Sequence, residues 1–259
     1  MRMMKKVLGT VTVLALSVSL LAGCGSTAVS PVSSTASTAA ESTTSSVVSE
    51  TTSAAADENA AAAAQLLNDL TGSYQELWPV ILADEYQQTW LDDCTALVGE
   101  ENAEAAFEKL SSMVTGDVYG EDAVEAYANG GGAYFCGFTN SLATLTFDGE
   151  TSTISGTDKD GNALFSHTYH YIGMEPVHGL YEFESDDADS GEFTYFFLAP
   201  DTSAETYHIE FRYGSDAEAL SQYDAGEYAY WVASGISTDC DQTMIYNCIE
   251  LFCTENLAG

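Results

Sequence analysis

Two side chains with metal-binding chemistry, His208 and Glu210, stand two residues apart in the segment "TYHIEFRYGSDAEAL". With the period of two of a β-strand, they share one face with Arg212, while the other face is apolar and carries Tyr207, Ile209, Phe211 and Tyr213. Imidazole nitrogen and carboxylate oxygen are both zinc ligands. Their Cα atoms would lie about 7 Å apart along a strand, so both side chains could reach one ion.

A zinc site needs a third protein ligand, because zinc takes four ligands, or three and a water. The remaining histidines of the chain are His167, His170 and His178. Positions 167 and 170 have opposite parity, so they point to opposite faces of a regular strand. If that strand belongs to a β-barrel, at most one of the two histidines faces the barrel interior, and we prefer His170. The alternative is that His208 and Glu210 form a polar pair near Arg212 at a barrel rim and bind no metal.

The elements that must position these residues divide the folded part in two. Helices are expected at Asp57–Leu70, at Tyr74–Asp93 with a break or new start near Trp78 because of Pro79, at Glu100–Gly116 and at Glu121–Tyr127. A final helix is expected after Thr238, with Asp239 as its cap.

Between the fourth and the final helix, the pattern changes to short alternating segments separated by turns. Asp148-Gly149 is a strong hairpin signal, and "DKDGN" marks the next turn. Eight strands without intervening helices predict an antiparallel barrel or sandwich. The expected strands lie within 129–138, 141–147, 150–156, 163–173, 179–187, 191–200, 206–214 and 227–235.

The N-terminus predicts export. "MRMMKK" is basic, the apolar run that follows is short for a membrane span, and Leu21-Ala22-Gly23-Cys24 resembles a bacterial lipobox. We therefore expect residues 1–23 to be a lipoprotein signal peptide and Cys24 to be lipidated, anchoring the protein outside the bacterial cell membrane. Residues 24–56 are rich in Ser, Thr and Ala and predict a disordered tether, and residues 57–259 form the folded domain.

Composition excludes some classes of function. Loss of Arg2, Lys5 and Lys6 with the signal peptide takes the formal charge from −34 to about −37, which excludes nucleic acid as a partner. The five cysteines after Cys24 include no Cys-x-x-Cys pair, so thiolate zinc patterns are absent, and export allows zero to two disulfides, which the spacing does not assign. No enzyme signature is present, and we expect a non-enzymatic protein.

The segment "YHIEFRYGSDAEAL", followed by "YAYWVASGI", resembles the C-terminal half of the ZinT/AdcA-type (YodA-like) zinc-binding domain. The resemblance extends from about Leu66 to the C-terminus and includes "GSYQELWPVIL" and "DDADSGEFTYF". It implies a mainly β fold with flanking helices: an antiparallel lipocalin/calycin-like barrel preceded by N-terminal helices and closed by a C-terminal helix. It also implies an exported protein that binds zinc at the barrel mouth and helps deliver it to a zinc ABC importer.

The ligand set departs from the family pattern, a His-aromatic-His strand with a third His upstream. His208 matches the first His, Ile209 takes the aromatic position, and Glu210 replaces the second His. No His occurs between Gly179 and Tyr207, so the upstream ligand is missing. We expect a zinc site at His208, Glu210 and His170, with altered affinity or metal preference. The alternative is a metal-free calycin that binds a small apolar ligand or a protein partner.

Overall fold

The computed structural model describes residues 58–200 and 208–258, all within the second of two units, Met1–Thr43 and Thr44–Gly259. The predicted signal peptide, lipidated cysteine and tether therefore lie outside the described residues. In chain order, the elements after a helix at residues 58–69 are β1 Gly72–Glu76, α2 Leu77–Ile81, η1 Asp84–Tyr86, α3 Gln87–Val98, α4 Ala103–Val114, α5 Glu121–Ala128, β2 Thr144–Asp148, β3 Thr153–Thr157, β4 Ala163–Met174, β5 Tyr181–Ser185, η2 Gly191–Phe193, β6 Tyr195–Leu198, β7 His208–Gly214, α6 Ala217–Leu220, β8 Ala233–Ser237 and α7 Gln242–Leu257.

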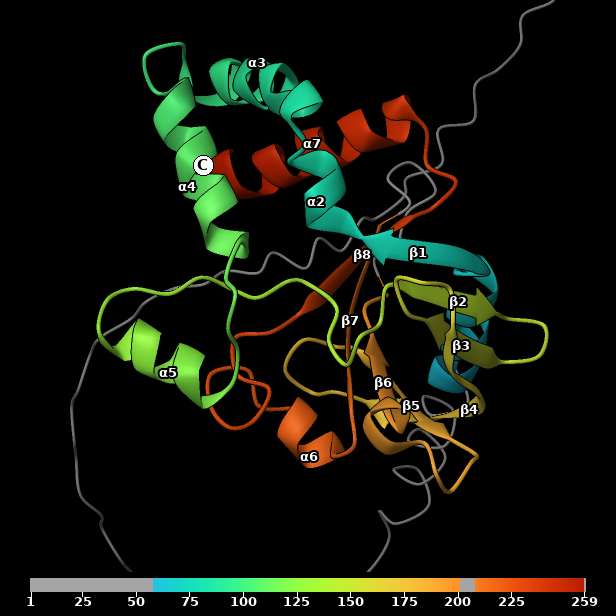
Figure 1. Ribbon diagram of the computed structural model, residues 1–259. Helices are drawn as coiled ribbons and strands as arrows, with labels where there is room; N and C mark the ends of the chain where they lie inside the picture. The colour runs from blue at the N-terminus through green and yellow to red at the C-terminus, as the bar shows by residue number, and fades with distance from the viewer. Residues whose placement is uncertain (1–57, 201–207, 259) are drawn as a thin grey trace, which may run out of the picture. The chain divides into compact units, whose positions relative to one another are not determined.

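The eight strands form a closed barrel in which every neighbouring pair is antiparallel (Figure 1). Consecutive strands pair from β1 to β8, and β1 closes the ring by pairing Tyr74 with Ser237. Closure leaves no unpaired edge strand. The fold class predicted from the sequence, an antiparallel lipocalin/calycin-like barrel with flanking helices, is confirmed.

The main difference between the expected and the observed elements is the first strand of the barrel. We expected Tyr74–Asp93 to be helical, but residues 72–76 form β1, and the helix α2 begins only at Leu77. The predicted strand within 129–138 does not exist, since only isolated bridges of Phe135 occur there. The helical propensity of residues 72–76 is outweighed by tertiary contacts. This segment pairs with both β2 and β8, and the pairing buries the side chain of Tyr74.

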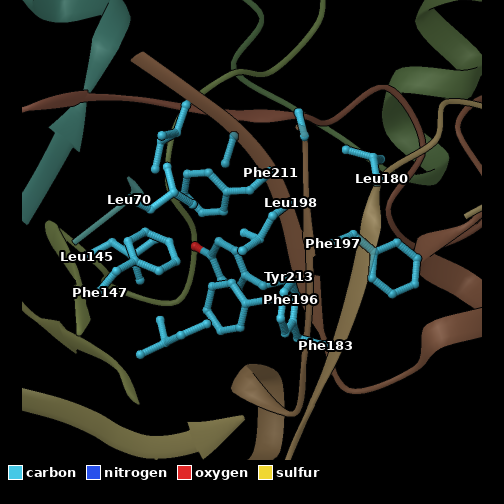
Figure 2. Close-up of a cluster of buried hydrophobic side chains, with 14 of the residues drawn as sticks. Leu70, Leu145, Phe147, Leu180, Phe183, Phe196, Phe197, Leu198, Phe211 and Tyr213 are labelled. Atoms are coloured by element: carbon cyan, nitrogen blue, oxygen red, sulfur yellow. The ribbon is translucent and has the colours of Figure 1, made fainter. Parts of the chain in front are cut away.

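The barrel interior is filled by aromatic side chains, several of which Figure 2 shows meeting at its centre. Phe196 lies 5.4 Å from Tyr213 and 6.3 Å from Phe211, ring centre to ring centre. The Tyr213 hydroxyl bonds to the Thr139 backbone, which satisfies the polar tip inside an apolar core. The interior is therefore a packed core rather than a ligand cavity.

A second core lies between the helices and one side of the barrel, where Figure 1 shows α2, α3, α4 and α7 grouped together. α7 is capped by Asp241, whose carboxylate accepts a bond from the Met244 N–H at 3.0 Å. The expected cap, Asp239, instead lies in the preceding turn. Among the described residues, no helix is both long and apolar enough to cross a membrane.

One carboxylate between α3 and α7 is poorly accommodated. Asp93 Oδ2 is buried without a hydrogen-bond partner, and burial, with Glu250 and Asp92 nearby, raises the pKa of Asp93 above its usual value of 3.8. The folded state therefore binds the carboxyl proton of Asp93 more tightly than the unfolded state does. The stabilisation that the protonated carboxyl contributes is lost as the pH rises through the folded-state pKa.

We expect Asp93→Asn to raise the free energy of unfolding at pH 7 by about 0.5–1 kcal/mol. The gain should shrink as the pH falls through the raised folded-state pKa of Asp93 and vanish below 3.8, the ordinary value, where Asp93 is protonated in both the folded and the unfolded state. Urea unfolding at several pH values measures it, with the exposed Glu100→Gln as control. A variant less stable than the parent at pH 7 would contradict the assignment.

Candidate metal site

β7 carries the two predicted zinc ligands on the outside of the barrel. Ile209, Phe211 and Tyr213 are buried in the barrel core, as the alternating pattern predicted. His208 and Glu210 therefore point away from the interior, towards the helices, and both are half-buried. The described geometry places them against α2 and α7, and not inside the barrel.

His208 and Glu210 line one cavity of about 30 Å³ between β7, α2 and α7. A space of this size holds an ion or one to two waters. The α2 side is apolar, formed by Leu77, Trp78 and Ile81. The α7 side adds two further metal-binding residue types, Cys248 and Glu255, together with Leu251 and Phe252.

The two α7 residues were missed by the sequence analysis, although a signal for them exists. Cys248, Leu251, Phe252 and Glu255 follow the spacing i, i+3, i+4, i+7, which places them on one face of a helix. Cys248 and Glu255, seven residues apart, therefore project from the same face of α7. Only the packing of α7 against β7 shows that this face meets His208.

The thiols near the pocket are held in their protonated form. Burial raises the pKa of Cys248 to about 12. Burial also raises the pKa of Cys136 to about 12, and the carboxylate of Glu210 adds to that shift. Both thiols are therefore neutral at pH 7, and a metal ion bound by Cys248 would have to displace its proton.

The donor types fit zinc, but their arrangement is not a finished site. Residues that carry nitrogen, sulfur and carboxylate oxygen donors line the cavity, and each of these atoms is a zinc donor. Across residues 58–200 and 208–258, however, no three His, Cys, Asp or Glu side chains are placed to hold a metal ion together. Side chains of β7 and α7 would have to move towards each other to complete a coordination shell.

His170, the predicted third ligand, does not line this cavity. It projects from the outer face of β4 and is about half exposed, with Nδ1 at 2.7 Å from Asp186 Oδ1 and Nε2 at 4.0 Å from Glu184 Oε2. The expectation that His170 faces the interior is wrong. His167, and not His170, lies on the same face of β4 as the buried residues Phe165 and Tyr169.

The other two histidines have partners of their own. His167 Nδ1 lies 2.8 Å from Asp187 Oδ2. His178 lies against the ring of Tyr223, 3.8 Å between ring centres, and its backbone N–H donates to Glu175. Neither lines the cavity that contains His208. The additional donors there come from α7 and not from a further histidine.

Arg212, next on the same face of β7, is fully buried. Its guanidinium donates to the carbonyls of Leu220, Gln222 and Tyr228, and lies 4.2 Å from the centre of the Tyr223 ring. Burial lowers its pKa, and Tyr223 counters that effect. Arg212 therefore holds the chain between α6 and β8 against the strand that carries His208 and Glu210.

The topology defines the class of this protein as a closed, eight-stranded, calycin-like barrel with a helical layer at one side. No family model matches the chain. No curated protein matches it either.

Among solved structures, the chain is similar to the Zn(II)-bound ZinT-like domain of AdcA from Streptococcus pneumoniae, with 15% identity, a TM-score of 0.44, and coverage of 70% of this chain and 87% of that chain. It is also similar to Zn(II)-bound AdcA from the same organism, with 13% identity, a TM-score of 0.42, and coverage of 71% of this chain and 34% of that chain. The chain thus spans about a third of the length of AdcA. The first of these structures is a ZinT-like domain, the domain type named in the sequence resemblance.

Proposed function

We propose that this protein is an exported metal-binding lipoprotein that recruits zinc in the cavity between β7 and α7. The observation that carries the proposal is that His208 and Glu210 of β7 and Cys248 and Glu255 of α7 line one small cavity. A set of one nitrogen, one sulfur and carboxylate oxygens suits zinc better than calcium or magnesium, which take oxygen ligands only. Zinc here is cargo, to be bound and released.

The arrangement of the donors supports reversible binding rather than permanent storage. A metal ion would draw together side chains from a strand and a helix that are not pre-assembled, and this reorganisation lowers affinity. The strongly negative charge of the chain raises the concentration of cations near its surface. Moderate affinity with ready supply is what a carrier that hands metal to another protein requires.

The N-terminal sequence supports the location and the partner. A lipid on Cys24 would anchor the protein outside the cell membrane, and residues 24–56 would let the domain reach a neighbouring membrane protein. We propose a component of a zinc ABC importer as that partner, because the resemblance of the sequence to the ZinT/AdcA-type domain implies a role in zinc delivery. Non-enzymatic function stays a prediction.

Zinc calorimetry on the full chain in detergent tests the proposal, in 0.15 M salt with excess magnesium to saturate oxygen-only sites. We expect one zinc per chain, and Glu255→Gln to weaken binding about 10-fold or more because a carboxylate donor is lost. Glu250→Gln is the matched control, since Glu250 lies on the same helix outside the cavity. Equal zinc affinity for both variants would exclude Glu255 as a ligand, and no saturable binding would exclude the function.

The alternative, a metal-free calycin with an apolar ligand, lacks room inside the barrel. The interior residues pack ring against ring, with the ring centres of Phe196 and Tyr213 5.4 Å apart. A shallow groove of about 340 Å³ does exist outside the barrel, where α2 meets the end of α4. Its lining includes Trp78, Leu82 and Phe135. If zinc does not bind, this groove is the place to look for the ligand.

A further inference from the structure

Two cysteine side chains from different helices meet in the helical core. Cys94 of α3 and Cys253 of α7 have their sulfur atoms 4.0 Å apart, and both residues are fully buried. They are separated by 159 positions in the sequence. The contact therefore depends on how the helices pack and cannot arise from local chain geometry.

The packing around the pair fixes its alignment. One turn before Cys94, the ring of Trp90 contacts Phe252, the neighbour of Cys253, with ring centres 6.0 Å apart and nearly perpendicular. Phe252 also packs edge-on against Trp78 of α2, with ring centres 4.7 Å apart. Such large buried rings resist sliding of one helix along the other. The two sulfurs are thus held facing each other by their surroundings.

We propose that Cys94 and Cys253 form a disulfide in the mature protein, linking α3 to α7. A disulfide has a sulfur–sulfur distance near 2.0 Å, so the sulfurs must approach by about 2 Å, which side-chain rotation and a small helix shift can supply. In the reaction, the thiolate of one cysteine attacks an external disulfide and releases one of its thiols, and the thiolate of the other cysteine then attacks the mixed disulfide and releases the second thiol. The two cysteines lose two protons and two electrons, and the external disulfide becomes two thiols.

Burial decides when the bridge forms. Cys94 and Cys253 are both fully buried in the helical core, so an external disulfide cannot reach either sulfur in the folded protein. Oxidation must therefore happen during folding, while α3 and α7 are still accessible. Once formed, the bridge is shielded from reductants by the same core.

The bridge would also support the zinc cavity. α7 carries Cys248 and Glu255, one and a half turns before and half a turn after Cys253. The covalent link closes a loop that contains every strand from β2 to β8. The position of α7 against β7 would then be fixed by a bond as well as by packing.

Mass spectrometry tests the proposal directly. The full chain is expressed with its own export signal, its free thiols are alkylated at harvest in denaturant so that buried thiols also react, and the protein is digested without reduction. We expect a peptide pair joined by Cys94 and Cys253. Recovery of both residues carrying the alkyl label, from folded protein, would overturn the proposal.

A stability measurement provides a second arm. Without reductant, Cys94→Ser and Cys253→Ser should each lower the melting temperature by about 10 °C, because each removes the same bridge. Cys240→Ser is the control for loss of a thiol outside the pair. After unfolding and refolding in reductant, the parent should lose the same ~10 °C. A parent whose melting temperature is unchanged by that treatment would contradict a stabilising bridge.

Discussion

Replacing Arg212 by alanine should lower the free energy of unfolding by about 4 kcal/mol, since it leaves two buried carbonyls and one part-buried carbonyl without this donor and opens a void. The guanidinium is fully buried and donates to Leu220, Gln222 and Tyr228, and its stack on Tyr223 compensates its charge. Urea unfolding followed by tryptophan fluorescence measures the loss, and Trp231 reports on the barrel core.

Two further variants separate the shape of Arg212 from its charge. Arg212→Lys keeps the charge but loses the planar fork, and we expect it to recover less than half of the lost stability. Lys159→Ala removes a cation whose side chain is 82% exposed, and should change the free energy of unfolding by less than about 0.5 kcal/mol. If Arg212→Ala stays within 1 kcal/mol of the parent, roughly the value of one hydrogen bond, the carbonyl contacts do not stabilise this loop.

His208→Ala should weaken zinc binding at least about 100-fold, because groups that only orient a metal ligand are already worth about 10- to 100-fold. His208 supplies the one imidazole of the cavity. The remaining donors would be carboxylates and a thiol whose burial raises its pKa to about 12, which bind zinc poorly at neutral pH. Calorimetry under the same salt and magnesium conditions measures the affinity.

His170→Ala is the matched control for His208→Ala. It removes an imidazole of equal size from the outer face of β4, where its partners are Asp186 and Glu184. We expect unchanged zinc affinity. If His170→Ala weakens binding as much as His208→Ala, the ligand set predicted from the sequence holds and the α7 residues do not complete the site. If neither variant changes the affinity, zinc binds elsewhere.

Where chemistry is local, the sequence alone determined the structure. Asp148 ends β2, and its carboxylate accepts bonds from the N–H groups of Glu150 and Thr151, which holds the loop that leads into β3. In "DKDGN", Asp158 accepts bonds from the N–H groups of Asp160 and Asn162, so the motif is a self-contained turn. The alternation at 208–213 correctly separates the core face of β7 from the face with His208.

The tertiary structure decided what depends on contacts between distant segments. β4 carries apolar residues on both faces, including the exposed Leu164 and Ile172, so parity alone could not say whether His170 points in or out. β1 is a strand only because β2 and β8 flank it. Likewise, Glu255 and His208 line one cavity, and Cys94 lies against Cys253, only because of how α7 packs in the folded chain. Helix and strand periods assign faces to a segment, but long-range packing chooses which faces meet.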